Sequence, residues 1–479
     1  MSLDFGLMEH HYFHNLHYEK FPDGTVKCIE DEIPFELPEG WEWTRLQAIC
    51  EPITDGTHKT PTYSDEGFIF LSSKNVTSGH IDWDNIMYIP ESLHNELYAR
   101  LAPQKNDILL AKNGTTGVAA IVDRDCIFDI YVSLALLRII GYIISPEYLL
   151  STIASSTIQN YFNSSLKGIG VPNLHLEHIR TTLIPVAPIN EQYRIATKLE
   201  QLLSFADNIE SDKTDLQTTI QLTKSKILDL AIRGKLVPQN PDDEPASVLL
   251  ERIRAEKEEL IKQGKIKRDK KGSVIFKGDD NSYYEKIGDT VTCIDEELPF
   301  DIPDNWAWIR LSSACIINPK NSIADDTIVS FVPMTLIQDG YANEFTFEQR
   351  KWGEVKKGFT HFAENDVGFA KITPCFENRK SVVFRGLCNG YGAGTTELHI
   401  LRAYPDTILP EYFLYLVKTE SFISGGKQTF SGAVGQQRVG KEYVYNYFCP
   451  VPPLSEQQRI IKKCSDIMTM LNSIEKSLS

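Results

Sequence analysis

The longest regular pattern of apolar and polar positions runs from Asn190 to Gly234. Steps of four and three residues from Ile195 reach eleven positions, nine of them apolar: Ile195, Leu199, Leu202, Ala206, Ile209, Lys213, Leu216, Ile220, Thr223, Ile227 and Leu230. A period of 3.5 residues predicts a coiled-coil helix. At about 1.5 Å per residue this helix is about 65 Å long, which favours a spacer over an ordinary core helix.

Both ends of the predicted helix carry terminating signals. A proline-rich stretch stops the preceding chain, and Asn190 is a suitable N-cap residue. Glu191 in the first turn is an anion where the helix dipole favours one. Gly234 can adopt a left-handed C-terminal cap, and Pro238 bars continuation of the helix.

The rest of the chain contains one unit twice. Residues 28–46 reappear as residues 293–311, and residues 185–195 reappear as residues 450–460, so both offsets are 265 (293 − 28 and 450 − 185). Because both ends share one offset, the bodies between them, 51–182 and 316–447, have equal length. Two domains of one ancestry are therefore expected on either side of the long helix.

Each body shows short β-rich runs separated by Gly, Asn and Asp turns, followed by helical patterns at 146–161 and 410–422. The predicted fold class is mixed α/β (α+β), with two duplicated domains separated by long helices that form an antiparallel coiled coil. The expected boundaries are an N-terminal arm 1–26, a first domain 27–188, central spacer helices 189–264, a linker 265–291, a second domain 292–453 and a shortened C-terminal spacer helix 454–479.

Composition places the chain among cytoplasmic globular proteins. No apolar run approaches the roughly 20 residues of a membrane span, and nine cysteines without a Cys-x-x-Cys pair fit a reducing compartment. The net charge of −16 argues against a protein that simply coats nucleic acid. Residues 316–447 are nevertheless neutral, with 14 Lys and Arg against 14 Asp and Glu, so local basic surfaces remain open.

Catalytic motifs are missing from the sequence. Residues 425–429, Gly-Gly-Lys-Gln-Thr, have the ending of a phosphate-binding loop, but position 421 is serine. No Asn/Asp-Pro-Pro-Tyr tetrad occurs, and Glu354-Val-Lys356 has no preceding Pro-Asp at a nuclease spacing. Four histidines between His10 and His17 have spacings that a helix could turn into a metal site, but a solvated segment is the better interpretation.

Three sets of residues carry a family resemblance. Pro-x-x-Glu-Gln-x-Arg-Ile precedes each spacer helix (188–195 and 453–460), and residues 227–254 begin Ile-Leu-Asp-Leu-Ala-Ile-Arg-Gly-Lys-Leu-Val-Pro. Residues 55–61 read Asp-Gly-Thr-His-Lys-Thr-Pro, and residues 369–378 read Phe-Ala-Lys-Ile-Thr-Pro-Cys-Phe-Glu-Asn. Together with the duplicated layout, these motifs resemble the DNA specificity subunit of type I restriction-modification systems, with two different target-recognition domains.

The resemblance implies a non-catalytic subunit in which each domain reads one half of a split DNA target. The helices set the spacing of the half-sites, about one turn of DNA apart, and dock two modification subunits. The expected partners are double-stranded DNA, those modification (methyltransferase) subunits and motor-nuclease subunits. No cofactor is expected in this chain, whereas S-adenosylmethionine, ATP and Mg are expected in the partner subunits. A partner would supply part of the phosphate neutralisation.

Base and phosphate contacts need donors and acceptors on loops. The candidates in the first domain are Thr57, His58, Lys59, Thr60, Lys74, Asn75, Lys112, Asn113 and Thr115. Those in the second domain are Lys371, Thr373, Asn378, Arg379, Lys380, Thr395, Thr396, Gln436, Gln437 and Arg438. The duplicated tryptophans Trp41, Trp43, Trp306 and Trp308 are interpreted as core residues.

The C-terminal helix has a shorter seam than the central one. A capping box, Ser-Glu-Gln-Gln at 455–458, is predicted to open it, and its partner-facing positions are Ile460, Ile467, Leu471 and Ile474. Because these positions match only the proximal half of the central helix, that half is expected to be its antiparallel partner. The distal seam from Leu216 to Leu230 is then expected to be covered by a helix at 245–262, by a modification subunit or by a second copy.

Two other classes of function remain open from the sequence. One is a self-sufficient enzyme that methylates or cuts DNA, against which the missing motifs count. The other is a protein-interaction scaffold, either an inactive specificity variant or one cassette of a recombining set, which the short C-terminal helix suggests.

Overall fold

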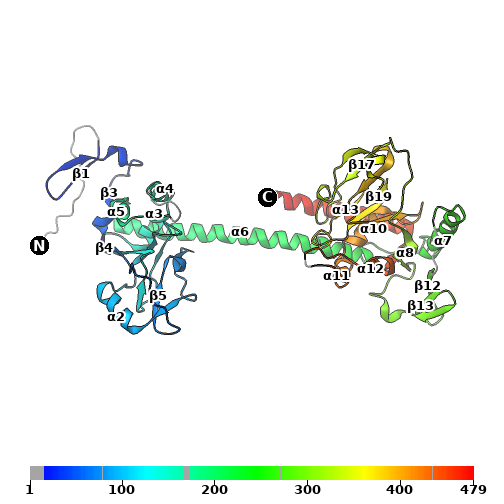
Figure 1. Ribbon diagram of the computed structural model, residues 1–479, viewed down its shortest axis with the longest axis horizontal. Coiled ribbons are helices and arrows are strands. Elements are labelled where there is room, and N and C mark those ends of the chain that lie inside the picture. The colour runs from blue at the N-terminus through cyan, green and yellow to red at the C-terminus, as the bar shows by residue number, and fades with distance from the viewer. Residues whose placement is uncertain are drawn as a thin grey trace. The chain divides into compact units, whose positions relative to one another are not determined.

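The computed structural model describes residues 16–77, 79–166, 172–266, 268, 272–433 and 435–478. The chain divides into two compact units, 1–209 and 210–479. The division falls within the helix α6 (Ile189–Ile232), a single helix of 44 residues (Figure 1). The predicted long helix is therefore confirmed. Asn190 lies inside its first turn because the helix begins one residue earlier, and Gly234 follows its end with a φ of 67°.

The first unit is built on two small sheets. A four-stranded antiparallel sheet has the order β4 (Cys50–Asp55), β10 (Leu134–Ile139), β7 (Ile108–Ala111), β8 (Ala119–Ile121). A three-stranded sheet has the order β6 (Met87–Ile89), β5 (Phe68–Leu71), β9 (Phe128–Ile130), with β5 and β9 parallel. Apolar residues of β7 and β10 alternate between two core clusters, one on each side of the sheet, so this sheet is buried on both faces.

Helices and a two-stranded sheet complete the first unit. They are α1 (Leu46–Ile49), α2 (Glu91–Arg100), α3 (Pro146–Ala154), α4 (Ser156–Ser164), α5 (Leu176–Thr181) and the pair β3 (Glu42–Arg45) and β11 (Leu183–Val186). A short hairpin, β1 (Tyr18–Lys20) and β2 (Val26–Cys28), precedes them. Since β11 leads directly into α6, the long helix is joined to the end of the domain.

The second unit repeats this arrangement. The sheet β16 (Cys315–Ile317), β23 (Leu398–Ala403), β20 (Val367–Ala370), β21 (Ser381–Val383) has the same order as β4-β10-β7-β8. Its companion has four strands in the order β18 (Glu348–Lys351), β17 (Ile328–Val332), β22 (Tyr391–Gly394), β19 (Thr360–Ala363). The mixed α/β class and the duplication predicted from the sequence are confirmed.

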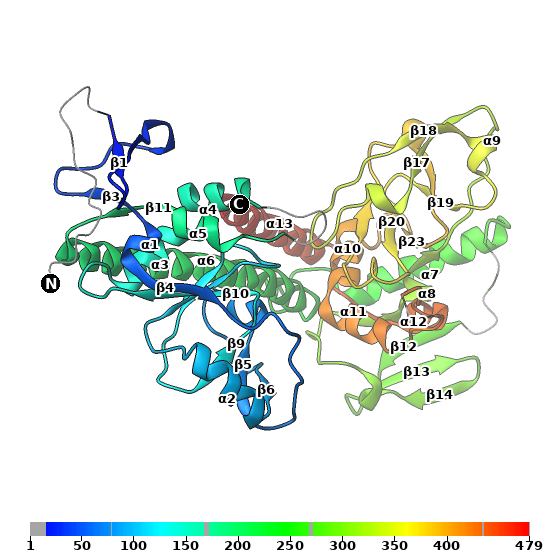
Figure 2. The same cartoon turned by 60° about the vertical axis from the view of Figure 1, so that its left-hand side comes forward.

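The remaining elements of the second unit surround these sheets. They are α7 (Ala246–Lys262), α8 (Leu311–Ala314), α9 (Trp352–Val355), α10 (Pro410–Lys418), α11 (Glu420–Lys427), α12 (Lys441–Asn446), α13 (Leu454–Ser477) and the pair β15 (Ala307–Arg310) and β24 (Phe448–Val451). A separate antiparallel sheet follows α7 in the chain and consists of β12 (Ser273–Lys277), β13 (Tyr283–Ile287) and β14 (Thr290–Cys293) (Figure 2).

Hydrogen bonds from buried side chains explain why the ends of the repeat kept their sequence. Gln192, at the start of α6, accepts from Ser145 N at 2.9 Å and donates to Ala187 O at 2.8 Å. Gln457, at the start of α13, accepts from Leu409 N at 2.9 Å and donates to Pro452 O at 3.1 Å. Both glutamines are fully buried, and a substitution would leave backbone groups without partners.

A second duplicated pair explains the repeated Asn-Asp motif. Asn106 and Asn365 have φ values of 72° and 67°, a conformation that asparagine tolerates in turns. The next residue of each motif binds an arginine on the neighbouring strand, with 2.7 Å between Asp107 Oδ2 and Arg138 Nη2. The corresponding distance from Asp366 to Arg402 is 2.6 Å. The motif is therefore a structural turn in both domains.

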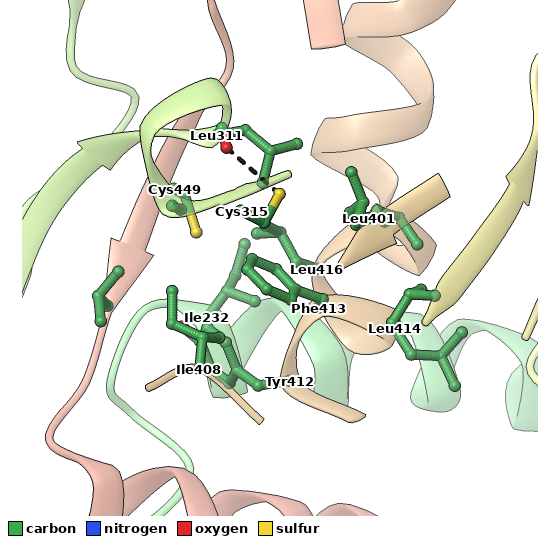
Figure 3. Close-up of a cluster of buried hydrophobic side chains, with 14 of the residues drawn as sticks. Ile232, Leu311, Cys315, Leu401, Ile408, Tyr412, Phe413, Leu414, Leu416 and Cys449 are labelled. Carbon is green, nitrogen blue, oxygen red and sulfur yellow. Dashed lines mark hydrogen bonds between the residues drawn. The ribbon is translucent and has the colours of Figure 1, made fainter. Parts of the chain in front are cut away.

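The core of the second unit extends onto the end of α6. Leu228, Ala231 and Ile232 are buried among residues of α7, α8, α10 and α13. Figure 3 shows Ile232 in this cluster near Tyr412 and Ile408, with the Cys315 thiol donating a hydrogen bond to Leu311 O at 3.4 Å. The last turns of the long helix are thus part of a domain core.

The helix α13 packs against the distal half of α6, contrary to the sequence-based expectation. Glu475 accepts hydrogen bonds of 2.6 Å from Gln221 Nε2 and from Lys224 Nζ. Glu456, at the other end of α13, accepts one of 2.6 Å from Gln239 Nε2. From Glu456 to Glu475 along α13, the contacted residues fall from Gln239 to Gln221, so the two segments run antiparallel.

The expected pairing was wrong because a repeat identifies similar segments, and similar segments need not touch. The strand β24 leads into α13, which packs on the core that also holds the end of α6. Ile220, in the distal half of α6, is only 2% exposed. The proximal part is open instead: residues 201–210 are all exposed, with Phe205 at 63%. The helix predicted at 245–262 exists as α7, which packs against α8 and β15 and shares a core cluster with the last turns of α6.

The capping box predicted at 455–458 is also corrected. The helix begins at Leu454, and no side-chain hydrogen bond caps its first turn. Ser455 lies inside that turn, where its hydroxyl donates to Asp243 Oδ1 at 2.8 Å. In a capping box the serine oxygen accepts from a backbone N–H, whereas here the Ser455 hydroxyl donates to a carboxylate distant in sequence.

Candidate nucleic-acid interface

Strand register brings the candidate residues of the first domain to one edge of the four-stranded sheet. Ala135 lies opposite Asp55 and Leu134 lies opposite Ala111, so β4 and β7 end where β10 begins. The loops after β4 and β7 carry the candidates at 57–60 and 112–115. The topology therefore places two of the three predicted loops side by side.

Hydrogen bonds join the third loop to this edge. Ser73 N donates to Ser133 Oγ at 2.9 Å, and Lys112 N donates to Ser133 O at 2.9 Å. Thr57 N donates to Ile130 O at 3.2 Å in the same region. The segments 56–60, 72–75 and 112–117 consequently meet around residues 130–134, and we call them the first loop cluster.

Lys112 lies beneath the first loop cluster and is not available at its surface. Its Nζ is 3.0 Å from Asp55 Oδ2, and the two side chains are 7% and 8% exposed. His58 lies above them with a side chain that is 70% exposed and with Nε2 3.2 Å from Asp55 Oδ1. Asp55 thus holds two candidate residues in place, one buried and one exposed.

Asn75 and Asn113 support the backbone of the same cluster. The buried Asn75 accepts from Ser72 N at 2.9 Å and donates to Asn85 O at 3.1 Å. Asn113 pairs through a β-bridge with Asn173, and the Oδ1 atoms of both residues are buried without a hydrogen-bond partner. The exposed candidates of the first domain are His58, Lys59, Thr60, Lys74 and Thr115.

Three segments also meet at the matching edge of the second domain. Lys371 N donates to Glu397 O at 2.9 Å, and Val439 N donates to Lys371 O at 2.8 Å. Thr373 N donates to Gln437 O at 2.9 Å, while the Thr373 hydroxyl accepts from Gln437 N at 3.1 Å. The segments 371–380, 395–397 and 436–439 form the second loop cluster.

An ion pair fixes one cation of the second loop cluster. Arg438 binds Glu397 through both carboxylate oxygens at 2.8 and 2.9 Å. The Arg438 hydrogen bonds lower the pKa of Glu397 below its ordinary value. The Arg438 side chain is still 42% exposed, so part of its guanidinium remains accessible.

Two further candidates of the second domain serve the loop structure. Arg379 has a φ of 57°, donates to Lys418 O at 3.1 Å and pairs with Glu420. Lys380 donates to Ile337 O at 2.7 Å. Lys418 donates to Arg379 O at 3.0 Å and is almost fully buried, which lowers its pKa to about 7.

The accessible part of the second cluster is small and mostly neutral. Asn378, Thr396 and Gln436 are exposed, and Lys371, Thr373, Thr395, Gln437 and Arg438 are partly exposed. Sequence reasoning missed Ser133, Glu397 and Lys418, which organise these loops. Their partners lie tens of residues away in the chain, so no local pattern marks them.

The duplicated tryptophans are core residues, as interpreted from the sequence. Trp43, Trp306 and Trp308 are at most 4% exposed, and Trp41 is partly buried. Trp306 donates through Nε1 to Glu456 at 2.9 Å.

The described residues contain neither a group of three metal-ligating side chains nor a helix long and apolar enough to cross a membrane. Of the four N-terminal histidines, His10, His11 and His14 lie outside the described residues.

Residues 38–217 match the model of a family described as the type I restriction modification DNA specificity domain. The chain is similar to the EcoAI specificity subunit of Escherichia coli, with 44% identity over 281 residues, which are 58% of this chain and 44% of that protein. It is 42% identical to the EcoEI specificity subunit of Escherichia coli over 60% of this chain and 46% of that protein. The aligned part thus spans less than half of these relatives.

Two solved structures share the fold. The HsdS subunit of Thermoanaerobacter tengcongensis aligns with a TM-score of 0.52 and 19% identity over 93% of each chain. A structure described as the basis of complex assembly and conformational transition of the type I R-M system aligns with a TM-score of 0.55 and 18% identity, over 93% of this chain and 94% of that one. These comparisons confirm the family resemblance and the fold class inferred from the sequence.

Proposed function

We propose that this chain is the non-catalytic DNA-recognition subunit of a type I restriction-modification complex, because residues 38–217 match the model of the type I restriction modification DNA specificity domain. Each domain reads one half of a bipartite target. The single observation that supports this most is the position of the two loop clusters, which lie at the matching edge of the same sheet in both repeats.

The exposed side chains of the clusters suit direct reading of a DNA groove. Gln436 and Asn378 can each form paired hydrogen bonds with an adenine edge, and Arg438 can do so with guanine. Lys59 and Lys74 are exposed cations without an ion pair in the described part of the chain, which suits phosphate contact. The buried Lys112 and Asn75 hold the loops and make no base contact in this assignment.

Both loop clusters expose few cations, which indicates that partner subunits contribute to phosphate contact. Phosphate contacts dominate the affinity of proteins for DNA, and a chain with a net charge of −16 supplies few of them. We therefore assign part of the phosphate contacts to two modification subunits, with S-adenosylmethionine bound there. Motor-nuclease subunits with ATP and Mg complete the complex in the cytoplasm, and the helices α6 and α13 set the spacing of the half-sites.

Two substitutions separate backbone contact from base reading in the chain assembled with its modification subunit. Lys59→Ala should lower the slope of log binding constant against log salt by about 1, because one phosphate contact is lost. Gln436→Ala should cost about 1–3 kcal/mol on the cognate site and relax the target at a single base pair of one half-site.

Lys105→Ala is the matched control, because Lys105 is exposed but precedes β7, at the opposite edge of the sheet from the loop cluster. It should change neither the salt slope nor the target. Equal effects of Lys59→Ala and Lys105→Ala, or an unchanged target in Gln436→Ala, would contradict this assignment of the reading surface.

A further inference from the structure

The second domain carries a covering segment that has no counterpart among the described residues of the first domain. This segment comprises residues 228–262: the end of α6, a loop and α7. Its apolar residues Leu228, Ile232, Leu249 and Ile253 are all buried in the core of the second unit. Since residues 28–50 align with 293–315 and residues 185–195 align with 450–460 at one offset, the contacts that the covering segment makes with these residues can be located on the first domain.

The start of the covering segment passes very close to the second domain. A Cβ atom on Gly234 would lie 2.4 Å from Pro303 Cγ and 3.2 Å from Trp306 Cζ2. The preceding Arg233 stacks 4.6 Å from the centre of the Phe300 ring. Glycine is required here both by this approach and by its φ of 67°.

The loop of the covering segment is held by polar contacts. Gln239 Nε2 donates to Glu456 Oε1 at 2.6 Å, and Trp306 donates to the other oxygen of the same carboxylate. Asp243 accepts from Arg459 Nη2 at 2.6 Å and from the Ser455 hydroxyl at 2.8 Å. The helix α7 then starts where Ala246 N donates to Asn305 O at 2.9 Å.

The equivalent positions of the first domain are present but uncovered. Phe35, which matches Phe300, is 46% exposed, and Trp41 is partly exposed where Trp306 is buried. Arg194 matches Arg459; it is exposed and has no carboxylate partner among the residues that the structure describes. Pro188 is exposed, whereas its counterpart Pro453 is buried.

An open apolar groove lies on the first domain where α7 covers the second. Its volume is about 380 Å³, and its lining includes Gly40, Trp43, Ala48 and Tyr142. Gly40 matches Asn305, the acceptor for the start of α7, and Ala48 lies in α1, the counterpart of α8 against which α7 packs. Tyr142 is 68% exposed, so an aromatic side chain at the groove is open to solvent.

We propose that this face of the first domain is a docking site for a partner polypeptide segment with the chemistry of residues 228–262. The segment ends a helix with Arg-Gly, continues with a loop that carries Gln and Asp, and forms an amphipathic helix of the pattern Ala-x-x-Leu-Leu-x-x-Ile. Its aspartate pairs with Arg194, its glycine crosses Pro38 and Trp41, and its apolar helix fills the groove.

The test uses the full chain and a fluorescent synthetic peptide of residues 229–262, measured by fluorescence anisotropy. Saturable binding is expected, and Arg194→Glu should weaken it at least tenfold. A peptide with Asp243→Arg should restore binding to the Arg194→Glu chain, because the ion pair is re-formed with reversed charges. Lys198→Glu is the matched control, since Lys198 is exposed one turn further along α6, and it should leave binding unchanged.

A photoreactive group at position 249 of the peptide locates the bound helix. Cross-links to residues 40–49 or 142–143 support the proposal. Cross-links to residues 305–314 would mean that the peptide displaces α7 from the second domain, and would overturn it. The proposal would also be overturned by the absence of saturable binding or by equal losses in Arg194→Glu and Lys198→Glu. Self-association of the chain that buries Tyr142 without peptide would overturn it as well, because the groove would then belong to a second copy.

Discussion

The ammonium group of Lys112 lies 3.0 Å from Oδ2 of Asp55, beneath the loops that carry the exposed candidates of the first domain. Asp55 is the last residue of β4, and Lys112 follows Ala111, the last residue of β7, so both lie at the same edge of the sheet. The carboxylate of Asp55 also lies 3.2 Å from His58 Nε2, but the His58 side chain is largely in solvent. The pair therefore anchors the first loop cluster from below.

Replacing Lys112 with methionine should destabilise the first loop cluster by about 3–5 kcal/mol, because a buried carboxylate loses its partner. Hydrogen exchange followed by mass spectrometry should show faster exchange in residues 56–60 and 112–117. Lys371→Met is the matched control: Lys371 occupies the equivalent position in the second domain, is partly exposed and forms no ion pair with a described residue. Its effect should stay within about 0.5 kcal/mol; comparable losses in both variants would contradict the assigned role of Asp55.

The buried Lys418 should make the second domain more stable as pH rises from 7 to 9. Burial lowers its folded pKa from 10.5 to about 7, so between these values the unfolded chain binds more protons than the folded one. Stability is then fully present above pH 10.5 and is lost as pH falls through about 7. From pH 7 to pH 9 the gain should be about 2 kcal/mol.

This gain is measured by urea unfolding of the second domain, with hydrogen exchange in residues 334–341 and 371–380 as the readout. The free energy of unfolding should be compared with that of Lys418→Met, which removes the titrating group and should remove the rise between pH 7 and pH 9. A rise of the same size in both proteins would show that other groups cause it.

Substitutions along α6 should separate assembly from folding. Phe205 is 63% exposed and Ile220 is 2% exposed, although both belong to the same helix. Phe205→Glu should leave the unfolding free energy within about 0.5 kcal/mol but weaken co-purification with a modification subunit, because we expect the helices to dock that subunit and residues 201–210 are an exposed stretch of α6. Ile220→Glu should destabilise the second unit by more than about 3 kcal/mol, because it buries an unpaired charge. Undiminished co-purification of the Phe205→Glu chain would count against docking there.

The glycine at the end of α6 should be far more sensitive to alanine than another glycine of the same backbone conformation. Gly234 and Gly264 have φ values of 67° and 70°, but only Gly234 has atoms within 4 Å of an added Cβ. Gly234→Ala should therefore cost about 1–3 kcal/mol more than Gly264→Ala. Differential scanning calorimetry gives the comparison, and equal costs would show that the close approach to Pro303 is relaxed in solution.

The repeat, the long helix and the mixed α/β class were predictable because each rests on local pattern or on an alignment of the chain with itself. The packing partner of α13 was not predictable in this way. Its sequence matches the proximal half of α6, but Glu475 binds Gln221 and Lys224 in the distal half. Similarity between two segments reports common ancestry, whereas contact depends on where each segment leaves its domain.

The candidate site was predictable at the level of loops and only partly at the level of residues. Thr60, Lys74 and Gln436 are exposed, as a contact surface requires. Lys112 is buried because Asp55, more than fifty residues earlier, supplies a carboxylate at the same sheet edge. A lysine that contacts a phosphate and a lysine that closes a buried ion pair have the same local sequence, so only the fold distinguishes them.

Exchange of one domain shows whether each domain reads its own half of the DNA target. Residues 27–188 would be replaced by the corresponding domain of another specificity subunit, and methylated adenines would be sequenced in cells that also produce the modification subunit. One half of the methylated target should change, while the other half and the spacing between the halves should stay the same. An unchanged target, or a change in both halves, would contradict the assignment of one half-site to each domain.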